Sequence, residues 1–172
     1  IVTDNEQLAD ELKLLRNHGL KDRNTCVKFA YNSRLDTLQA VVAKHLIDNR
    51  LNLITKSRIN NAKLYDKHLG DIHSLKIPER IPHNKEVFHL YTFQADQRDD
   101  LAFYLQKNGV DAKIHYPIPM HMQPAAKKYN HNIGDFPVAE ELCKTTISLP
   151  VHEFVSEREI LYVSQLIKKF YS

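Results

Sequence analysis

The sequence predicts an α/β fold of the α+β kind, in which a small sheet packs against helices and one long helix lies near the start. Segments rich in aromatic and β-branched residues alternate with segments of helical periodicity, which indicates strands separated by helices. The composition is 42% hydrophobic and 26% charged, as is typical of a globular protein. A chain of 172 residues is long enough for one domain with its own core, or for one domain plus the edge of another.

The elements follow from apolar spacing and from turn residues. Helices are predicted over 5–16, from about 33 to 69, and over 97–109, 138–144 and 156–171, and strands over 87–95, 110–117 and 147–150. Thr3 or Asp4 is the expected N-cap of the first helix. Ser33 and Asp36 have the spacing of a capping box at the start of the long one. Four prolines within 117–137 predict a long loop.

Charge and cysteine content argue against several classes of function. The net charge is +3, and the basic residues are scattered among acids, so nucleic-acid binding has little support. Cys26 and Cys143 form no disulfide framework and no metal motif, which favours reduced thiols in the cytoplasm. No apolar run is long enough to span a membrane. We therefore expect a cytoplasmic protein without a nucleic-acid or membrane partner.

The stretch YNSR, residues 31–34, places an aromatic ring, an amide and a guanidinium just before the predicted long helix. A helix N-terminus favours anions, and Asn32 and Arg34 add donors that suit a phosphate. The alternative is that Asn32 caps the helix while Arg34 is a solvated or ion-paired surface residue.

The stretch HYPIPMHMQ, residues 115–123, gathers His115, Tyr116, His121 and Gln123 in a proline-stiffened loop. Imidazole, phenol and amide groups can donate to sugar hydroxyls and to phosphate oxygens. The alternative is that His115 and Tyr116 only pack the loop against the domain. A metal site that uses His115, His121 and His131 is disfavoured, because no Glu or Cys stands at a ligand spacing.

Four stretches together resemble one known family. They are IVTDNEQLADELKLLRNHG, YNSRLDTLQAVVAKHL, QRDDLAFYLQKNGVDAKIHYPIPMHMQPA and FPVAEELCKTTISLPVHEFVSEREI. In order and spacing they are similar to the C-terminal part of the DegT/StrS family of pyridoxal phosphate (PLP)-dependent sugar aminotransferases. The resemblance covers nearly the whole chain. One departure is Ala30, where the family usually has Gly.

The resemblance implies the small domain of the fold type I PLP-dependent transferases. Residues 1–20 are then expected to end the large PLP-binding domain, with IVT as the end of a strand, and residues 21–172 to form the C-terminal small domain. The Schiff-base lysine of the family lies upstream of the stretch that resembles residues 1–19. We therefore expect no catalytic residue within this chain and no activity from it alone.

The resemblance also implies roles for the candidate residues. Asn32 would bind the PLP phosphate of a neighbouring subunit in a homodimer, and Arg34 could add a charge-assisted hydrogen bond to that phosphate. Tyr31, His115, Tyr116, His121 and Gln123 would contact a nucleotide-linked keto-sugar, to which an amino group passes from an amino acid, usually glutamate. Polysaccharide biosynthesis is one ordinary setting for the family. The alternative function is a non-catalytic binding module that has kept the small-domain fold.

Overall fold

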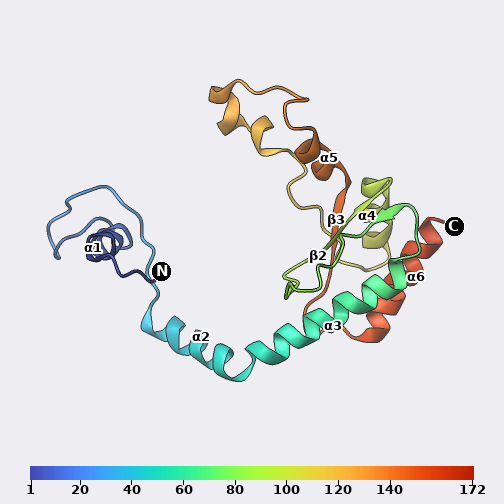
Figure 1. The fold of residues 1–172 in the computed structure, drawn as a ribbon, viewed down its shortest axis with the longest axis horizontal. Coiled ribbons are helices and arrows are strands. Elements are labelled where there is room, and N and C mark those ends of the chain that lie inside the picture. Colours follow the sequence, from blue (N-terminus) through green and yellow to red (C-terminus); the bar gives the residue numbers. More distant parts are fainter. The chain divides into compact units, whose positions relative to one another are not determined.

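The computed structural model describes residues 1–172, which form two compact units, Ile1–Arg50 and Leu51–Ser172. Figure 1 shows the elements in chain order. The first unit holds α1 (Glu6–Leu15) and α2 (Thr37–Asn49). The second holds α3 (Leu51–Leu69), β1 (Leu75–Lys76), β2 (Tyr91–Ala95), α4 (Arg98–Lys107), the 3₁₀ helices η1 (Met120–Met122) and η2 (Pro124–Tyr129), α5 (Pro137–Thr145), β3 (Thr146–Leu149) and α6 (Glu157–Phe170).

The start of the first unit differs slightly from the prediction. Residues 1–3 form no strand. Asn5, and not Thr3 or Asp4, is the N-cap of α1, and its side chain accepts a hydrogen bond from the backbone N–H of Leu8 at 3.0 Å. Asn at this position satisfies one of the four N–H groups that a helix leaves unpaired at its start.

The segment after α1 folds back along the end of that helix. Gly19 adopts a positive φ of 70° there, and a Cβ atom at this position would lie 1.8 Å from the backbone oxygen of Lys28. Glycine is therefore required both by the backbone conformation and by the close approach of the returning chain. The return places Asn32 opposite Asn17 in an isolated antiparallel bridge.

The predicted long helix over 33–69 is two helices, so that prediction is wrong in its extent. α2 ends at Asn49, Arg50 has φ −124° and ψ −27°, and α3 begins at Leu51. The Asn49 amide donates to the backbone oxygen of His45 at 2.9 Å, a local bond of the kind that favours helix ends over helix interiors. Asp36 is the N-cap rather than the fourth residue of a box begun by Ser33, and its N–H donates to the side chain of Gln39.

A three-stranded antiparallel sheet of order β1-β2-β3 forms the centre of the second unit. β2 is shorter than the predicted strand over 87–95. The strand predicted over 110–117 is absent, and Lys113 pairs with Ser148 only in an isolated bridge. Tyr116 has a left-handed φ of 56°, and Pro117 lacks an N–H, so the ladder cannot extend beyond this point.

The core of the second unit lies between the sheet and helices α3, α4 and α6. Alternate residues of β2 are buried, as expected for an antiparallel strand with one covered face. Tyr65 of α3 stacks on Tyr91 of β2 with ring centroids 4.8 Å apart. The mixed helix and sheet architecture confirms the predicted fold class. Each helix is either too short or too polar to span a lipid bilayer.

Candidate functional site

The first candidate site lies in the unit Ile1–Arg50 and centres on two side chains that contact each other. Arg34 Nε donates to Asn32 Oδ1 at 3.0 Å, and Arg34 Nη1 donates to Asn17 Oδ1 at 3.2 Å. Arg34 engages the side-chain oxygen of Asn32, and the NH₂ group of Asn32 has no partner within the chain, so this group is available to another partner. Arg34 forms no ion pair with a carboxylate, so its charge is not neutralised within the chain.

The local backbone places this pair differently from the sequence-based expectation. α2 begins only at Thr37, and Asp36 brings a carboxylate to its N-terminus. The donors of the site are therefore the amide and the guanidinium, and not free N–H groups of the helix. The bridge between Asn17 and Asn32 fixes the segment, together with the N–H of Ser33, which donates to Arg16 O at 2.9 Å.

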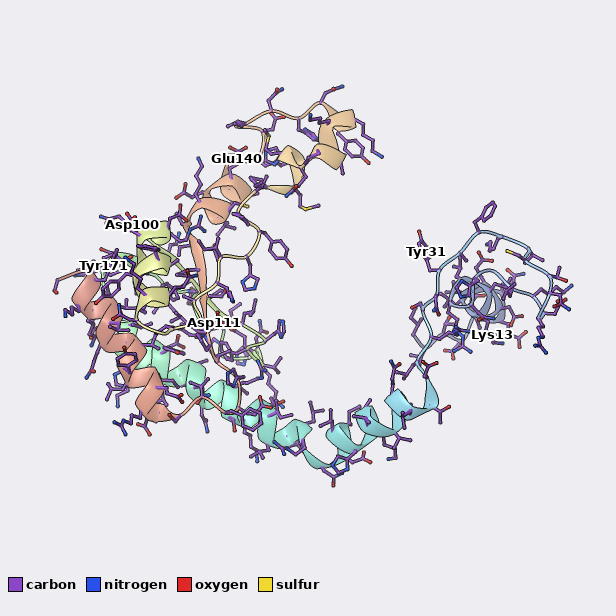
Figure 2. The ribbon with its side chains drawn as sticks, turned by 180° about the vertical axis from the view of Figure 1, so that it is seen from behind. Lys13, Tyr31, Asp100, Asp111, Glu140 and Tyr171 are labelled. Atoms are coloured by element: carbon purple, nitrogen blue, oxygen red, sulfur yellow. The ribbon has the colours of Figure 1, made fainter.

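Tyr31 precedes this pair on the segment that runs beside α1 (Figure 2). Its backbone is held at both ends, since its N–H donates to Leu15 O and its oxygen accepts from His18 N. Its side chain is free, with 78% of its surface exposed. Ala30 has no positive φ, so the departure from the family's usual Gly causes no backbone strain here.

The second candidate site lies in the unit Leu51–Ser172, where the loop after Lys113 leaves the sheet. His115 Nδ1 is 2.9 Å from Oγ of Ser148, a buried residue of β3. The neighbouring Tyr116 is 79% exposed. Its left-handed φ before a proline is a sparsely populated conformation for a non-glycine residue. The sheet thus anchors the histidine, and the strained backbone turns the tyrosine toward solvent.

His121 lies in η1 of the same loop, in a separate cluster with residues around the start of α5. Its side chain is only 7% exposed, and its Nε2 is 3.1 Å from Oε1 of Glu140 in α5. The imidazole ring packs 4.9 Å from the ring of Phe136, and His131 packs on the same phenyl ring. His131 Nδ1 also contacts Asp135 at 3.3 Å.

Two carboxylates of this cluster have perturbed acidity. The pKa of Glu140 is lowered, first by the hydrogen bond from the backbone N–H of Gly134 and further by the N–H of Phe136 and by His121. The pKa of Asp135 is lowered chiefly by the backbone N–H of Asn132. Both groups are therefore held as carboxylates at neutral pH.

The predicted site residues are only partly brought together. Asn32 and Arg34 share a hydrogen bond, and the rings of His115 and Tyr116 are 6.3 Å apart. No hydrogen bond or ring contact joins His115 to His121. Gln123 donates weakly, at 3.4 Å, to the backbone oxygen of Ile118. No group of three or more His, Cys, Asp or Glu side chains has the geometry of a metal site.

Three residues that sequence reasoning did not single out support these side chains. Asn17 orients Arg34, Ser148 holds His115, and Glu140 faces His121. Asn17 and Ser148 each stand far along the chain from the residue they contact, so no local pattern marks them. Glu140 stands in the short stretch FPVAEEL. A glutamate is common on the solvent-exposed face of a helix, so the sequence does not mark this one as functional.

Comparison with known proteins identifies the family of this chain. Residues 1–168 match the model of the DegT/DnrJ/EryC1/StrS aminotransferase family. The chain belongs to this family. The resemblance inferred from four sequence stretches is thereby confirmed, together with the predicted fold.

Curated relatives of the family include sugar transaminases. The chain is 29% identical to the dTDP-3-amino-3,4,6-trideoxy-alpha-D-glucose transaminase of Streptomyces venezuelae over 99% of this chain and 45% of that protein. It is 33% identical to the UDP-N-acetyl-3-dehydro-alpha-D-glucosamine 3-aminotransferase of Acidithiobacillus ferrooxidans over 98% of this chain and 45% of that protein. The chain thus spans about half the length of the curated relatives it matches.

Solved structures of the family have the same fold. S. venezuelae DesV, crystallised with a ketimine intermediate, superposes with a TM-score of 0.88 at 29% identity, over 99% of this chain and 46% of that one. A DegT/DnrJ/EryC1/StrS aminotransferase from Brucella abortus superposes with a TM-score of 0.81 at 31% identity, over 99% and 45%.

Proposed function

We propose that the chain is the C-terminal portion of a PLP-dependent aminotransferase that transfers an amino group from an amino acid, glutamate by family resemblance, to a nucleotide-linked keto-sugar. The observation that carries this proposal is the family match over residues 1–168. The sugar transaminases among the relatives support the substrate class. Residues 1–20 would end the large domain and residues 21–172 would form the small one.

The residues of the first candidate site are suited to the phosphate of PLP. A phosphate needs donors without a competing carboxylate, and the Asn32 NH₂ group and the unneutralised Arg34 meet that requirement. When bound, PLP would supply the electrophilic carbon and the electron sink for amino-group exchange. The contribution of this chain would be to bind and orient the phosphate, in a homodimer whose active site is shared across the interface.

The second candidate site would bind the sugar nucleotide. His115 and Tyr116 stand where a ligand at the loop could meet them, and Gln123 of the same unit adds an amide. These groups can donate to hydroxyls and to diphosphate oxygens. The second nitrogen of His115 is left for a ligand, because Nδ1 is engaged by Ser148.

The visible absorption spectrum of the protein expressed from the complete reading frame, before and after borohydride, tests this proposal first. A yellow protein that bleaches as PLP becomes fixed to a lysine upstream of this chain supports the aminotransferase. A colourless protein that takes up no PLP overturns it and favours a binding module that has kept the fold. The 172-residue chain alone is expected to show no transaminase turnover.

The role of Asn32 is tested by Asn32→Asp in the complete protein. The substitution keeps the size of the side chain but replaces the donor with a negative charge. A hydrogen bond to a charged group contributes about 1.5–3 kcal/mol, so PLP affinity should fall by about 10- to 100-fold. Asn24→Asp, an exposed asparagine of the same unit, is the matched control. Equal effects of the two substitutions would contradict the cofactor role.

A further inference from the structure

Glu140 gathers donors from two separate parts of the loop before α5. Its Oε1 accepts from the backbone N–H of Gly134 at 2.8 Å and from that of Phe136 at 3.3 Å. The same oxygen lies 3.1 Å from Nε2 of His121. Figure 2 labels Glu140 on α5. One carboxylate oxygen thus links the helix to the turn that precedes it and to η1.

The burial of this carboxylate makes its partners necessary. The Glu140 side chain is 10% exposed, and a buried carboxylate is costly unless it is paired and hydrogen-bonded. Gly134 has a positive φ of 97°, which turns the chain so that its N–H and that of Phe136 reach the same oxygen. If Glu140 were removed, these two N–H groups would lose their acceptor within the chain.

His121 contacts this carboxylate from inside the loop. Because a carboxylate can only accept, Nε2 must carry the hydrogen for the pair to attract each other. The Nε2–H does not point straight at the carboxylate in spite of the 3.1 Å distance, so the contact is mainly electrostatic. With 7% of its side chain exposed, His121 has little surface to offer a substrate, unlike the exposed Tyr116 and Met120.

We propose that Glu140 is a positioning residue of the candidate substrate loop. Acting on His121 and on the N–H groups of Gly134 and Phe136, it holds residues 117–136 against α5 and thereby presents the exposed side chains of the loop to the sugar nucleotide. His121 then supports the loop from its buried side. The contacts stand independently of the proposed function, but the use of the loop for substrate rests on it.

Tryptic cleavage of the chain after Lys127 and Lys128 measures how often the loop opens. Both lysines are exposed in η2, and the cleavage rate follows the population of the open form when closing is fast. Glu140→Ala should raise cleavage at these two bonds by about tenfold, which corresponds to about 1.4 kcal/mol. Glu141→Ala, the exposed neighbour on the same helix, should leave cleavage unchanged. Equal rates for the two variants would overturn the proposal.

Two milder variants separate the parts of this contact. His121→Phe keeps a ring against Phe136 but removes the nitrogen, so cleavage should rise while the Gly134 amide stays protected from hydrogen exchange. Glu140→Gln keeps an acceptor for the backbone N–H groups, and it serves if the alanine variant fails to fold. In Glu140→Gln the ¹⁵N chemical shift of the His121 ring should change, because the ring no longer faces a carboxylate. A contact of packing alone would leave this chemical shift unchanged. An unchanged ring spectrum in Glu140→Gln would contradict the pairing.

Steady-state kinetics of the complete protein test the link to substrate. Glu140→Gln should raise KM for the sugar nucleotide several-fold and leave kcat nearly unchanged, because the residue does not touch the reacting atoms. A looser loop with an unchanged KM would overturn the positioning role for substrate. A wild-type protein without any aminotransferase activity would instead overturn the proposed function, and the trypsin result would then decide the role of Glu140 alone.

Discussion

The buried amide of Asn61 offers a sharp test of what holds the second unit together. Its Nδ2 donates to the backbone oxygens of His152 at 2.9 Å and Val155 at 3.2 Å, with Val151 O at 3.5 Å. These carbonyls belong to the connection between β3 and α6. The amide therefore ties that connection to α3, and its removal should destabilise the unit.

The magnitude follows from the contacts. Two hydrogen bonds contribute about 1 kcal/mol each, and a buried carbonyl left without a donor costs about 1–3 kcal/mol more. Asn61→Ala should therefore lower the free energy of unfolding by about 3–5 kcal/mol relative to Asn60→Ala. Asn60 is exposed on the same helix, so the gain in helix propensity is the same in both variants and cancels.

Urea unfolding followed by near-ultraviolet circular dichroism is the appropriate assay. The stacked pair of Tyr65 and Tyr91 lies in the core of this unit, so its signal reports on the relevant transition. Asn61→Asp should be more damaging than the alanine variant, because it places a carboxylate against three carbonyl oxygens. A difference below about 1 kcal/mol between Asn61→Ala and Asn60→Ala would refute the reasoning.

Three further predictions concern other parts of the chain. The hydrogen bonds from the Ser156 hydroxyl, and then from its N–H, lower the pKa of Glu159 from its ordinary value of 4.5. The stability that this pair contributes is therefore present above pH 4.5 and is lost as the pH falls through the lowered pKa. The loss of stability with falling pH should accordingly be shallower in Ser156→Ala when acid unfolding is measured. Gly19→Ala should abolish hydrogen-exchange protection in the first unit, because its Cβ would meet a backbone oxygen, whereas Gly109→Ala has open space and costs only left-handed strain, about 1–2 kcal/mol. The apolar side chains exposed along α2 should make the chain self-associate, and Leu38→Glu should reduce the mass measured by light scattering; a monodisperse wild-type monomer would contradict this.

Sequence reasoning succeeded where a local pattern decides the structure. The helices at 97–109 and 156–171 were predicted because apolar spacing and end residues agree, and α4 and α6 lie within those ranges. It failed where the local pattern favours an element that the backbone conformation or the strand pairing does not continue. Apolar spacing continues through Arg50, yet the helix breaks there. Residues 110–117 have strand composition but pair with β3 only in the single bridge between Lys113 and Ser148.

The candidate sites show the same division. The residues with a marked local setting, such as Asn32 before a helix and His115 after an apolar segment, were identified from the sequence as candidates. Their supports were not, because Ser148 and Glu140 act across the fold from ordinary positions. The interpretation of His121 as a ligand contact remains a prediction, although its burial beside Glu140 favours a supporting role.

Both candidate sites leave one side of a polar group available by engaging its other side. Arg34 binds the oxygen of Asn32 and leaves the NH₂ group free, while Ser148 engages Nδ1 of His115 and leaves Nε2. A side chain oriented in this way loses less conformational entropy when a ligand arrives. Under the proposed function, the phosphate of PLP and the diphosphate of a sugar nucleotide would both present acceptors only, so polar groups fixed in advance would suit either ligand.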